Sequence, residues 1–157
     1  MKMLLCALLL TFSKSTTPPK SSTILKEYVQ DVVEKKLSDT EIGDKYFCTQ
    51  MLHRTDQKGE DARKYLQFAL SYQRSSLQKK QVKLDEVKFL LYDSLPPNEL
   101  PTKPFHMLGE TTNVYVAQYN GEIVCFFLLQ NDKIASTLLI NQGGESYFID
   151  FCTGYPM

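Results

Sequence analysis

The sequence has no surplus of charge of either sign. Its 157 residues include 18 Lys and Arg against 18 Asp and Glu, which gives a formal net charge of zero. Proteins that bind nucleic acids or anionic lipids electrostatically carry clustered basic residues. The basic pairs Arg63–Lys64 and Lys79–Lys80 are short and lie near acidic residues. We therefore predict no nucleic-acid partner.

The sequence also lacks the spacings that mark metal, redox and catalytic sites. Its four cysteines form no Cys-x-x-Cys pair, and its two histidines, His53 and His106, form no His-x-x-x-His pair. We find no glycine-rich phosphate loop and no Ser-His-Asp spacing. Both histidines fall in predicted connections, where surface polar residues are common. We predict no metal, no cofactor and no catalytic residue, and we favour a protein that is not an enzyme.

Only one long hydrophobic run is present, at the N-terminus. It covers residues 3–12 (MLLCALLLTF), follows Lys2, and precedes Ser13 and Ser15, the small residues that a signal peptidase requires. The run is too short for a transmembrane helix, which takes roughly 20 residues. We predict a signal peptide over 1–15, a linker over 16–22, and an exported (periplasmic or secreted) mature chain without a transmembrane segment. Its net charge would be −2, because Lys2 and Lys14 are removed. The alternative is a buried helix of the folded domain.

Three helices are predicted in the first half of the mature chain. The first, over residues 23–37, has apolar residues at helical spacing. The capping box Ser38-x-x-Glu41 opens a second helix that runs to about Leu52. The third runs from Glu60 to Leu77 after Gly59 breaks the pattern, and its broad apolar stripe suggests contacts with more than one neighbour.

The second half changes to the period of β-strands. A first strand is predicted over 84–92 and, after a proline-rich connection, four more over 113–119, 122–130, 133–141 and 145–152. Asn120-Gly121 and Gly143-Gly144 are typical of two-residue hairpin turns, and Asn131-Asp132 tolerates a positive φ. The prediction is one α+β domain over residues 23–157, with three N-terminal helices packed on one face of a curved antiparallel sheet of about five strands.

Two-residue turns would fix the register of the closing strands. Val116 would face Cys125, Cys125 would face Leu138, and Leu138 would face Ile149. Cys125 and Cys152 would then lie on opposite faces, beyond the Cα separation of about 7 Å that a disulfide allows. Cys48 is left able to reach one of them.

Both faces of the predicted sheet are apolar. A half-solvated antiparallel sheet alternates apolar with polar residues, so both faces of this sheet need cover, and the three helices supply only one. We expect the helices to cover the Cys125 face. The second face would then stay uncovered in a single chain, and its apolar residues are Tyr115, Phe126, Leu128, Leu139 and Phe148.

Asp150 stands out because aspartate is depleted in strands. It falls among apolar residues, opposite Thr137. A buried carboxylate is costly unless it is hydrogen-bonded, hydrated or functionally perturbed. We favour a structural interpretation, in which the Thr137 hydroxyl donates to Asp150, over a ligand site.

The order of elements resembles that of the NTF2-like and cystatin-like superfamily. The resemblance rests on the helix at 23–37, the short helix ending in Tyr46-Phe47, the long helix at 60–77 and the strands that follow. It extends to small exported bacterial proteins of this fold without assigned activity, and it implies a pocket or a dimer. Many NTF2-like proteins place a hairpin where this chain has only residues 53–58, and the Asp/His/Tyr clusters of catalytic members have no counterpart here.

The first functional hypothesis is a non-catalytic exported binding or interaction protein, in which the second sheet face engages another copy, as a homodimer, or a protein partner. A large exposed apolar patch usually marks an interface. One alternative is a lyase or isomerase that uses Asp150 in a pocket between helices and sheet. Another is an inhibitor or immunity protein for a secreted partner. The ligand or interface candidates are Asp150, Thr137, Tyr115, Phe126, Leu128, Leu139 and Phe148.

Overall fold

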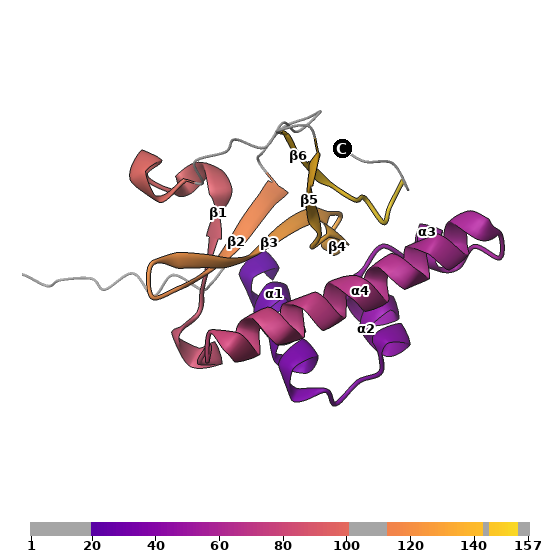
Figure 1. The fold of residues 1–157 in the computed structure, drawn as a ribbon, viewed down its shortest axis with the longest axis horizontal. Helices are drawn as coiled ribbons and strands as arrows, with labels where there is room; N and C mark the ends of the chain where they lie inside the picture. Colours follow the sequence, from indigo (N-terminus) through magenta and orange to yellow (C-terminus); the bar gives the residue numbers. More distant parts are fainter. Residues whose placement is uncertain (1–19, 101–112, 143–144, 154–157) are drawn as a thin grey trace, which may run out of the picture.

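A computed structural model describes residues 20–100, 113–142 and 145–153. Helices occupy the first half of the chain and strands the second (Figure 1), which confirms the predicted α+β class. The predicted signal peptide lies outside the described residues. The helices are α1 (Lys20–Glu34), α2 (Asp39–Tyr46), α3 (Thr49–Leu52) and α4 (Gln57–Lys79), with single 3₁₀ turns η1 (Leu84–Glu86), η2 (Tyr92–Ser94) and η3 (Pro97–Glu99). The strands are β1 (Lys88–Leu91), β2 (Val114–Tyr119), β3 (Glu122–Gln130), β4 (Lys133–Ser136), β5 (Leu139–Gln142) and β6 (Glu145–Phe148).

Helix α1 buries the apolar stripe that predicts it, including Leu25, Tyr28 and Val32. It begins at Lys20, so the last residues of the predicted linker are helical. It ends at Glu34 because Lys35 adopts a φ of 53°, the left-handed conformation that terminates helices.

The predicted second helix is divided into α2 and α3. Its capping box is confirmed, since the Ser38 N–H donates to Glu41 Oε2 at 2.8 Å and the Glu41 N–H donates to Ser38 Oγ at 3.3 Å. The division falls at Phe47, which forms a parallel bridge with Ile134, and at Cys48, whose N–H donates to the Ile134 carbonyl at 3.1 Å. Pairing with the sheet edge takes these two residues out of the helix.

Helix α4 is longer than predicted because its N-cap is Asp56, whose carboxylate accepts from the Gly59 N–H at 3.2 Å. Gly59 lies inside the first turn instead of breaking the helix. A Cβ at this position would lie 2.2 Å from the Arg54 carbonyl oxygen, so the close approach of the preceding loop requires glycine.

The strands form two sheets. One is antiparallel with the order β1-β2-β3-β4, and the other is the β5-β6 hairpin. Positive φ angles at Asn120 (51°), Gly121 (79°), Asn131 (49°) and Asp132 (59°) confirm two of the predicted turns. The turn predicted at residues 143–144 lies outside the described residues.

A bulge in β3 changes the predicted register of β2. The pairs next to the Asn120-Gly121 turn are those that a two-residue turn predicts, but Ala117 then pairs with Cys125, which leaves Val124 as an extra residue. Val116 consequently faces Phe126, not Cys125. Because a one-residue shift exchanges the two faces of a strand, Tyr115 and Ala117 pack with the helix-side core. The face predicted for Tyr115 was therefore wrong.

The strand predicted over residues 133–141 is two strands. The register of β3 with β4 shifts next to Leu128, which pairs with Ser136. The chain then turns away, with the Leu138 N–H donating to Ser136 Oγ at 3.2 Å. In the hairpin, Leu139 pairs with Phe148 and the Ile149 N–H donates to the Leu138 carbonyl at 3.3 Å, which confirms the predicted Leu138–Ile149 register.

The chain itself covers the second face of the main sheet. Val114, Leu128, Ala135, Phe148 and Cys48 form a buried cluster separate from the helix-side core. The side chains of Leu128 and Phe148 are only 3% and 0% exposed. The expectation that this face stays uncovered in a single chain is therefore wrong for Leu128 and Phe148, which are buried in this cluster, whereas Phe126 and Leu139 stay partly exposed.

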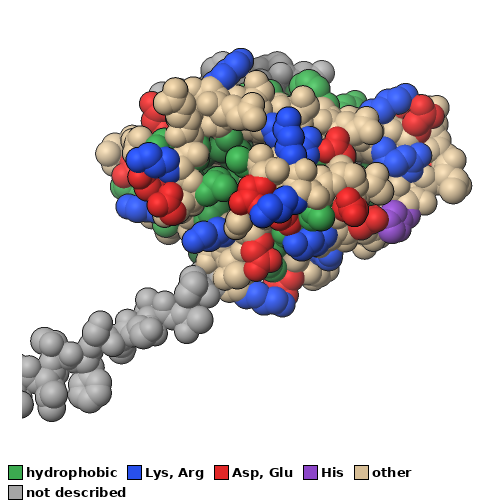
Figure 2. All heavy atoms as spheres, turned by 90° about the horizontal axis from the view of Figure 1, so that it is seen from below, with side chains coloured by type: hydrophobic (Ala, Val, Ile, Leu, Met, Phe, Trp, Pro, Cys, Tyr) green, Lys and Arg blue, Asp and Glu red, His purple; other side chains and the backbone are tan. Residues whose placement is uncertain are grey.

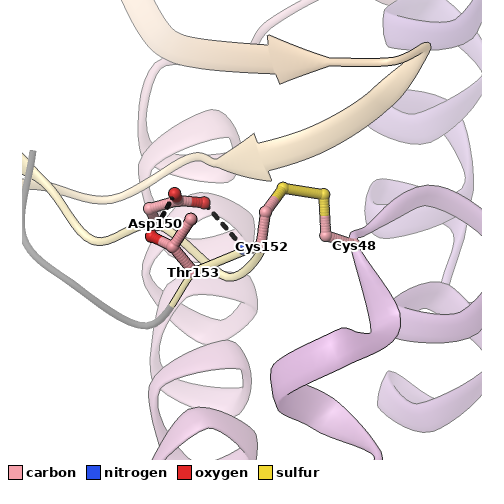
Figure 3. The surroundings of a disulfide bond; sticks show 4 residues. All are labelled: Cys48, Asp150, Cys152 and Thr153. Carbon is pink, nitrogen blue, oxygen red and sulfur yellow. Dashed lines mark hydrogen bonds between the residues drawn. A yellow bond between two sulfur atoms is a disulfide. The ribbon is translucent and has the colours of Figure 1, made fainter.

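A disulfide joins Cys48, just before α3, to Cys152 in the C-terminal segment (Figure 3). The two Cα atoms are 4.9 Å apart, although 104 positions separate the residues in sequence. Cys125 is free and buried. The prediction that Cys125 and Cys152 do not bond is confirmed, and the structure pairs Cys48 with Cys152.

Candidate ligand-binding cleft

A large cavity lies between α4 and the strands, with a volume of about 930 Å³. This volume falls in the usual range for small-molecule sites. Its walls come from α4, from β3 around the bulge, from the segment that joins β4 to β5, and from the start of β5. The lining residues are Lys64, Tyr65, Phe68, Tyr72, Gln73 and Ser76 of α4, its C-cap Lys80, Ile123, Val124, Cys125 and Phe126 of β3, and Thr137, Leu138, Leu139 and Ile140.

Gln73 is buried in the wall of this cleft and only half satisfied. Its side chain is 5% exposed, and its Oε1 accepts a hydrogen bond from the Tyr28 hydroxyl. Its Nε2 is buried without a hydrogen-bond partner in the described part of the chain. A buried polar group left unpaired costs about 1–3 kcal/mol. The N–H groups of Gln73 Nε2, which have no acceptor in the described chain, therefore destabilise the folded chain.

Thr137 is the second unsatisfied residue in the lining. Its side chain is 8% exposed and interacts with the Tyr28 hydroxyl, but its buried Oγ1 makes no hydrogen bond of normal geometry to a described residue. It lies where the chain leaves β4 and has not yet entered β5, so strand pairing does not use it. Two residues with poorly satisfied polar groups thus occur among those that line the cleft, although Gln73 Nε2 and Thr137 Oγ1 are themselves buried.

The open side of the cleft carries exposed aromatic residues from α4. Tyr65, Phe68 and Tyr72 are 46%, 59% and 63% exposed. The Phe68 and Tyr72 rings are stacked, with centroids 6.4 Å apart and an interplanar angle of 22°. Positions 65, 68 and 72 fall on one side of a helix, so these rings form an apolar ridge that we call the α4 ridge.

The charged groups of the described lining are two lysines. Lys64 pairs with Glu60 at 2.7 Å, and Lys80 pairs with Glu122 at 2.7 Å. Neither a carboxylate nor a histidine occurs among the described residues that line the cleft. Burial raises the pKa of the Cys125 thiol to about 12, which keeps it protonated and unreactive at neutral pH. On the face drawn in Figure 2, basic and acidic side chains are intermixed, and hydrophobic side chains are visible in a hollow among them.

Asp150 lies outside this cleft and is fully satisfied. Its carboxylate accepts from the Cys152 N–H at 2.7 Å and from the Thr153 hydroxyl at 2.6 Å (Figure 3). It borders a smaller cavity of about 190 Å³. The predicted hydrogen bond from Thr137 is not formed, because Thr153 takes that place. A threonine hydroxyl therefore does donate to Asp150, but it belongs to Thr153 and not to Thr137.

The remaining candidates are divided between the cleft and the core. Phe126 and Leu139 line the cleft together with Thr137. Leu128 and Phe148 are buried, and Tyr115 packs against the helix-side core. Phe126, Leu139 and Tyr115 are partly exposed.

Gln73 was missed in the sequence analysis, although a signal was present. Leu66, Ala69, Leu70, Gln73 and Leu77 form the buried side of α4, so a glutamine occupies a position that the helical period assigns to the core. A polar residue in an apolar stripe needs a partner, and this criterion applied to α4 would have identified it.

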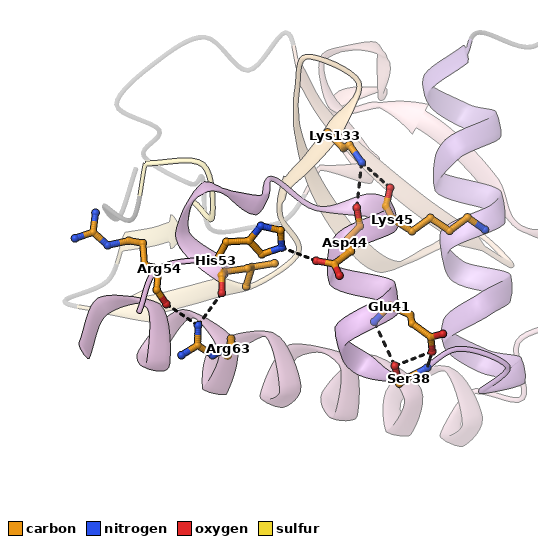
Figure 4. A network of polar contacts seen from close by, with 9 residues as sticks. Ser38, Glu41, Asp44, Lys45, His53, Arg54, Arg63 and Lys133 are labelled. Atoms are coloured by element: carbon orange, nitrogen blue, oxygen red, sulfur yellow. Dashed lines mark hydrogen bonds and ion pairs between the residues drawn. The ribbon is translucent and has the colours of Figure 1, made fainter. Parts of the chain in front are cut away.

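A polar network around His53 holds the short helices against α4 (Figure 4). His53 Nε2 lies 2.8 Å from Asp44 Oδ1. Arg63 Nη1 donates to two carbonyl oxygens at the end of α3, at 2.7 and 2.8 Å, and so satisfies groups that a helix terminus leaves unpaired. Lys133 Nζ donates to the Lys45 carbonyl at 2.7 Å. His53 therefore has a surface structural contact, and His106 lies outside the described residues.

Other classes of site find no support in the described chain. No group of three or more His, Cys, Asp or Glu side chains in the described ranges is placed to hold a metal ion. None of the described helices combines the length and apolar character needed to cross a membrane. Comparison with protein-family models, curated proteins and solved structures finds no match. The NTF2-like resemblance therefore stays a prediction.

Proposed function

We propose that the chain is an exported, non-catalytic binding protein that takes a small apolar molecule into the cleft between α4 and the strands. One observation carries the proposal: a cleft of about 930 Å³ between α4 and the strands is lined mainly by apolar side chains, with the polar residues Gln73 and Thr137 among them. Small-molecule sites are mostly apolar clefts with a few placed polar groups, and this cleft has that composition.

The titratable groups of the cleft favour binding over catalysis. Acid–base catalysis needs a group whose pKa lies near the working pH. The titratable side chains of the described lining are Lys64, Tyr65, Tyr72, Lys80 and Cys125, and Asp150, which a lyase or isomerase would use, stabilises a turn elsewhere.

Two features support export. The sequence of residues 1–15 is typical of a signal peptide, and the Cys48–Cys152 disulfide fits an oxidising compartment. Both the cleavage and the disulfide can be tested by alkylating the free cysteines under denaturing, non-reducing conditions and counting the labels by mass spectrometry. A cleaved chain should take one label, at Cys125, whereas an uncleaved chain should take two, at Cys6 and Cys125. Further labels would mean that the disulfide is absent.

The first functional hypothesis also includes a homodimer formed through the second sheet face. This more specific part of the hypothesis has less support. Burial of Leu128 and Phe148 removes two of its five apolar residues from the surface. Tyr115, Phe126 and Leu139 remain partly exposed. Sedimentation velocity of the wild type over a hundredfold concentration range measures the association directly, and a constant monomer would end this part of the proposal.

Fluorescence titration with N-phenyl-1-naphthylamine tests apolar binding. Ser75 and Ser76 are neighbours on α4, but only Ser76 lines the cleft. We expect Ser76→Trp to weaken probe binding at least tenfold by filling the cleft, and Ser75→Trp to bind like the wild type. Equal effects of the two variants, or no binding by the wild type, would refute the proposed site.

A further inference from the structure

We infer that the cleft binds an extended apolar peptide, which adds to the main sheet as a strand along the β3 edge between Glu122 and Cys125. The inference rests on the proposed function and names the class of its ligand. It is carried by the incomplete pairing of β3, by the apolar walls beside that edge, and by the length of the cleft.

Strand β3 has a neighbour along only part of one edge. Its pairing with β2 runs from Glu122 to Leu128, whereas its pairing with β4 covers only Leu128 to Gln130. The chain leaves the sheet after Ser136, and β5 pairs with β6 instead. Among the described residues, no strand therefore lies on the outer side of Glu122 to Cys125. In Figure 1 the turn end of the β2-β3 hairpin projects past β4.

The backbone of Ile123 points toward this open edge. A two-residue hairpin turn is closed by a hydrogen bond between the residues that flank it, which here are the paired residues Tyr119 and Glu122. Along a strand, the backbone groups of successive residues point alternately to one neighbour and to the other. The N–H and carbonyl of Ile123 therefore point away from β2, where an added strand would form hydrogen bonds with them.

This edge belongs to the wall of the cleft. Ile123, Val124 and Cys125 are among the residues that line it, and Ile123 and Val124 are partly exposed. A sheet edge recruits further strands, because its outward N–H and C=O groups need partners. A peptide in the cleft can supply these partners with its own backbone, which is a recurring mode of peptide recognition.

The side chains beside the edge favour apolar residues in the peptide. The α4 ridge borders the cleft on its open side, and Leu139 and Ile140 of β5 contribute to its lining. Alternate side chains of a strand point to the same face. Every second side chain of the added strand would therefore lie against the apolar lining, and the others would point away from it. A peptide that alternates apolar with polar residues fits this arrangement.

The length of the cleft fits a single short strand. Its α4 wall runs from Lys64 to Lys80, which is about 24 Å at the rise of a helix. A strand of about seven residues spans nearly the same distance. The ion pair of Lys80 with Glu122, at 2.7 Å, joins the end of α4 to the turn end of β3. The helix and the strand edge thus border the cleft together.

The exposed apolar area favours a peptide over a second copy of the chain. Tyr65, Phe68 and Tyr72 of the α4 ridge are 46%, 59% and 63% exposed. At about 150–250 Å² for each aromatic side chain, the ridge offers roughly 250–420 Å². A stable interface between folded proteins takes about 800 Å² from each partner. A second folded copy would also bring its own neighbouring strand and helix, whereas a single strand fits between α4 and β5.

Hydrogen exchange at the Ile123 amide tests the inference in the wild-type protein. The probe is a blocked peptide of about six residues that alternates valine with threonine. The Ile123 N–H should exchange at least tenfold more slowly at saturating peptide, whereas the Glu122 N–H, which faces β2, should respond far less. Saturation without protection at Ile123 would overturn the inference. Protection of Ile123 in the free protein would also overturn it, because the chain or a second copy would then already occupy the edge.

Two N-methylated forms of this peptide are matched controls for recognition of the backbone. The methyl groups are placed on alternate residues, in two complementary sets, so that each form loses the N–H groups of one edge and keeps every side chain. One form should bind at least tenfold more weakly than the other, because only one edge of the peptide faces β3. Equal affinities of the two forms would refute addition as a strand.

Displacement of N-phenyl-1-naphthylamine separates this inference from the proposed function. The alternating peptide should displace the naphthylamine at least tenfold more effectively than a peptide of the same composition with its valines grouped at one end, because only alternation places every valine against the lining. Naphthylamine binding that the alternating peptide does not displace would keep the apolar cleft and refute the added strand. A wild type that binds neither compound would refute the proposed function as well.

Discussion

Asp150 and the pair Gln73–Thr137 are all buried polar residues, but they differ in what surrounds them. The Asp150 carboxylate accepts two hydrogen bonds, from the Cys152 N–H and the Thr153 hydroxyl, next to the disulfide. Gln73 Nε2 and Thr137 Oγ1 make no hydrogen bond of normal geometry in the described chain, and they belong to residues that line the cleft. Burial alone therefore does not identify a binding residue. The informative property is whether the fold satisfies the buried group.

Breaking the disulfide should have the largest effect on the satisfied region. In the chain-entropy description, a cross-link across about 100 residues stabilises by about 4–5 kcal/mol, and this one spans 104. The double variant Cys48→Ser, Cys152→Ser should lose about this much free energy of unfolding in urea titrations. Cys125→Ala leaves the cross-link intact and serves as the control. An unchanged urea midpoint on adding reductant to the wild type would contradict the prediction.

Removing the Asp150 carboxylate should have the next largest effect. Asp150→Ala leaves the Cys152 N–H and the Thr153 hydroxyl without their acceptor, and hydrogen bonds to charged groups are worth about 1.5–3 kcal/mol. We expect a loss of about 2–3 kcal/mol in chemical denaturation, with probe binding in the cleft retained. Loss of probe binding in a folded Asp150→Ala protein would show that the two regions are coupled.

Substitutions in the Asn120-Gly121 turn test how much this turn stabilises the β2-β3 hairpin. Strand β3 of this hairpin lines the cleft, and the turn is separate from the region around Asp150. Gly121 has a φ of 79°, and a Cβ there would meet nothing within 4 Å, so the cost of a substitution is conformational. Gly121→Val should lose about 1–2 kcal/mol, measured by thermal or urea unfolding. Asn120→Gly keeps a positive φ accessible and should cost less. Equal stability of Gly121→Val and wild type would mean that the turn has another geometry in solution.

Two threonine-to-valine substitutions provide the sharpest comparison at the smallest scale. Thr153→Val removes a hydroxyl that donates to Asp150 at 2.6 Å and should cost about 1 kcal/mol. Thr137→Val removes a hydroxyl that makes no hydrogen bond of normal geometry in the described chain, and it should cost less than Thr153→Val, under about 0.5 kcal/mol. Urea unfolding of the two variants side by side measures the difference. A larger loss in Thr137→Val than in Thr153→Val would reverse our assignment of satisfied and unsatisfied groups.

The strands show where prediction from sequence stops. Next to the Asn120-Gly121 turn, the pairs between β2 and β3 are those that the turn predicts. Beyond Ala117, the extra residue Val124 shifts the register by one and moves Tyr115 to the helix side. No residue near Val124 signals the bulge, because valine is an ordinary strand residue.

Only some residues of the candidate site could be predicted from the sequence. Thr137 was selected as the partner of Asp150, but it lines the cleft beside Tyr28 instead. Phe126 and Leu139 were selected as interface residues, and they line the same cleft. Gln73 follows from the helical period only if polar residues inside an apolar stripe are examined one by one.

By itself the sequence determined the α+β class, the helical stripe of α1, the Ser38 capping box and the two turns with positive φ, because these depend on residues a few positions apart. Tertiary structure decided the division of the second helix at Phe47, the pairing of Cys48 with Cys152, the separate β5-β6 hairpin and the cleft beside α4. Each of these depends on contacts between residues distant in sequence, whose formation depends on how the whole chain packs.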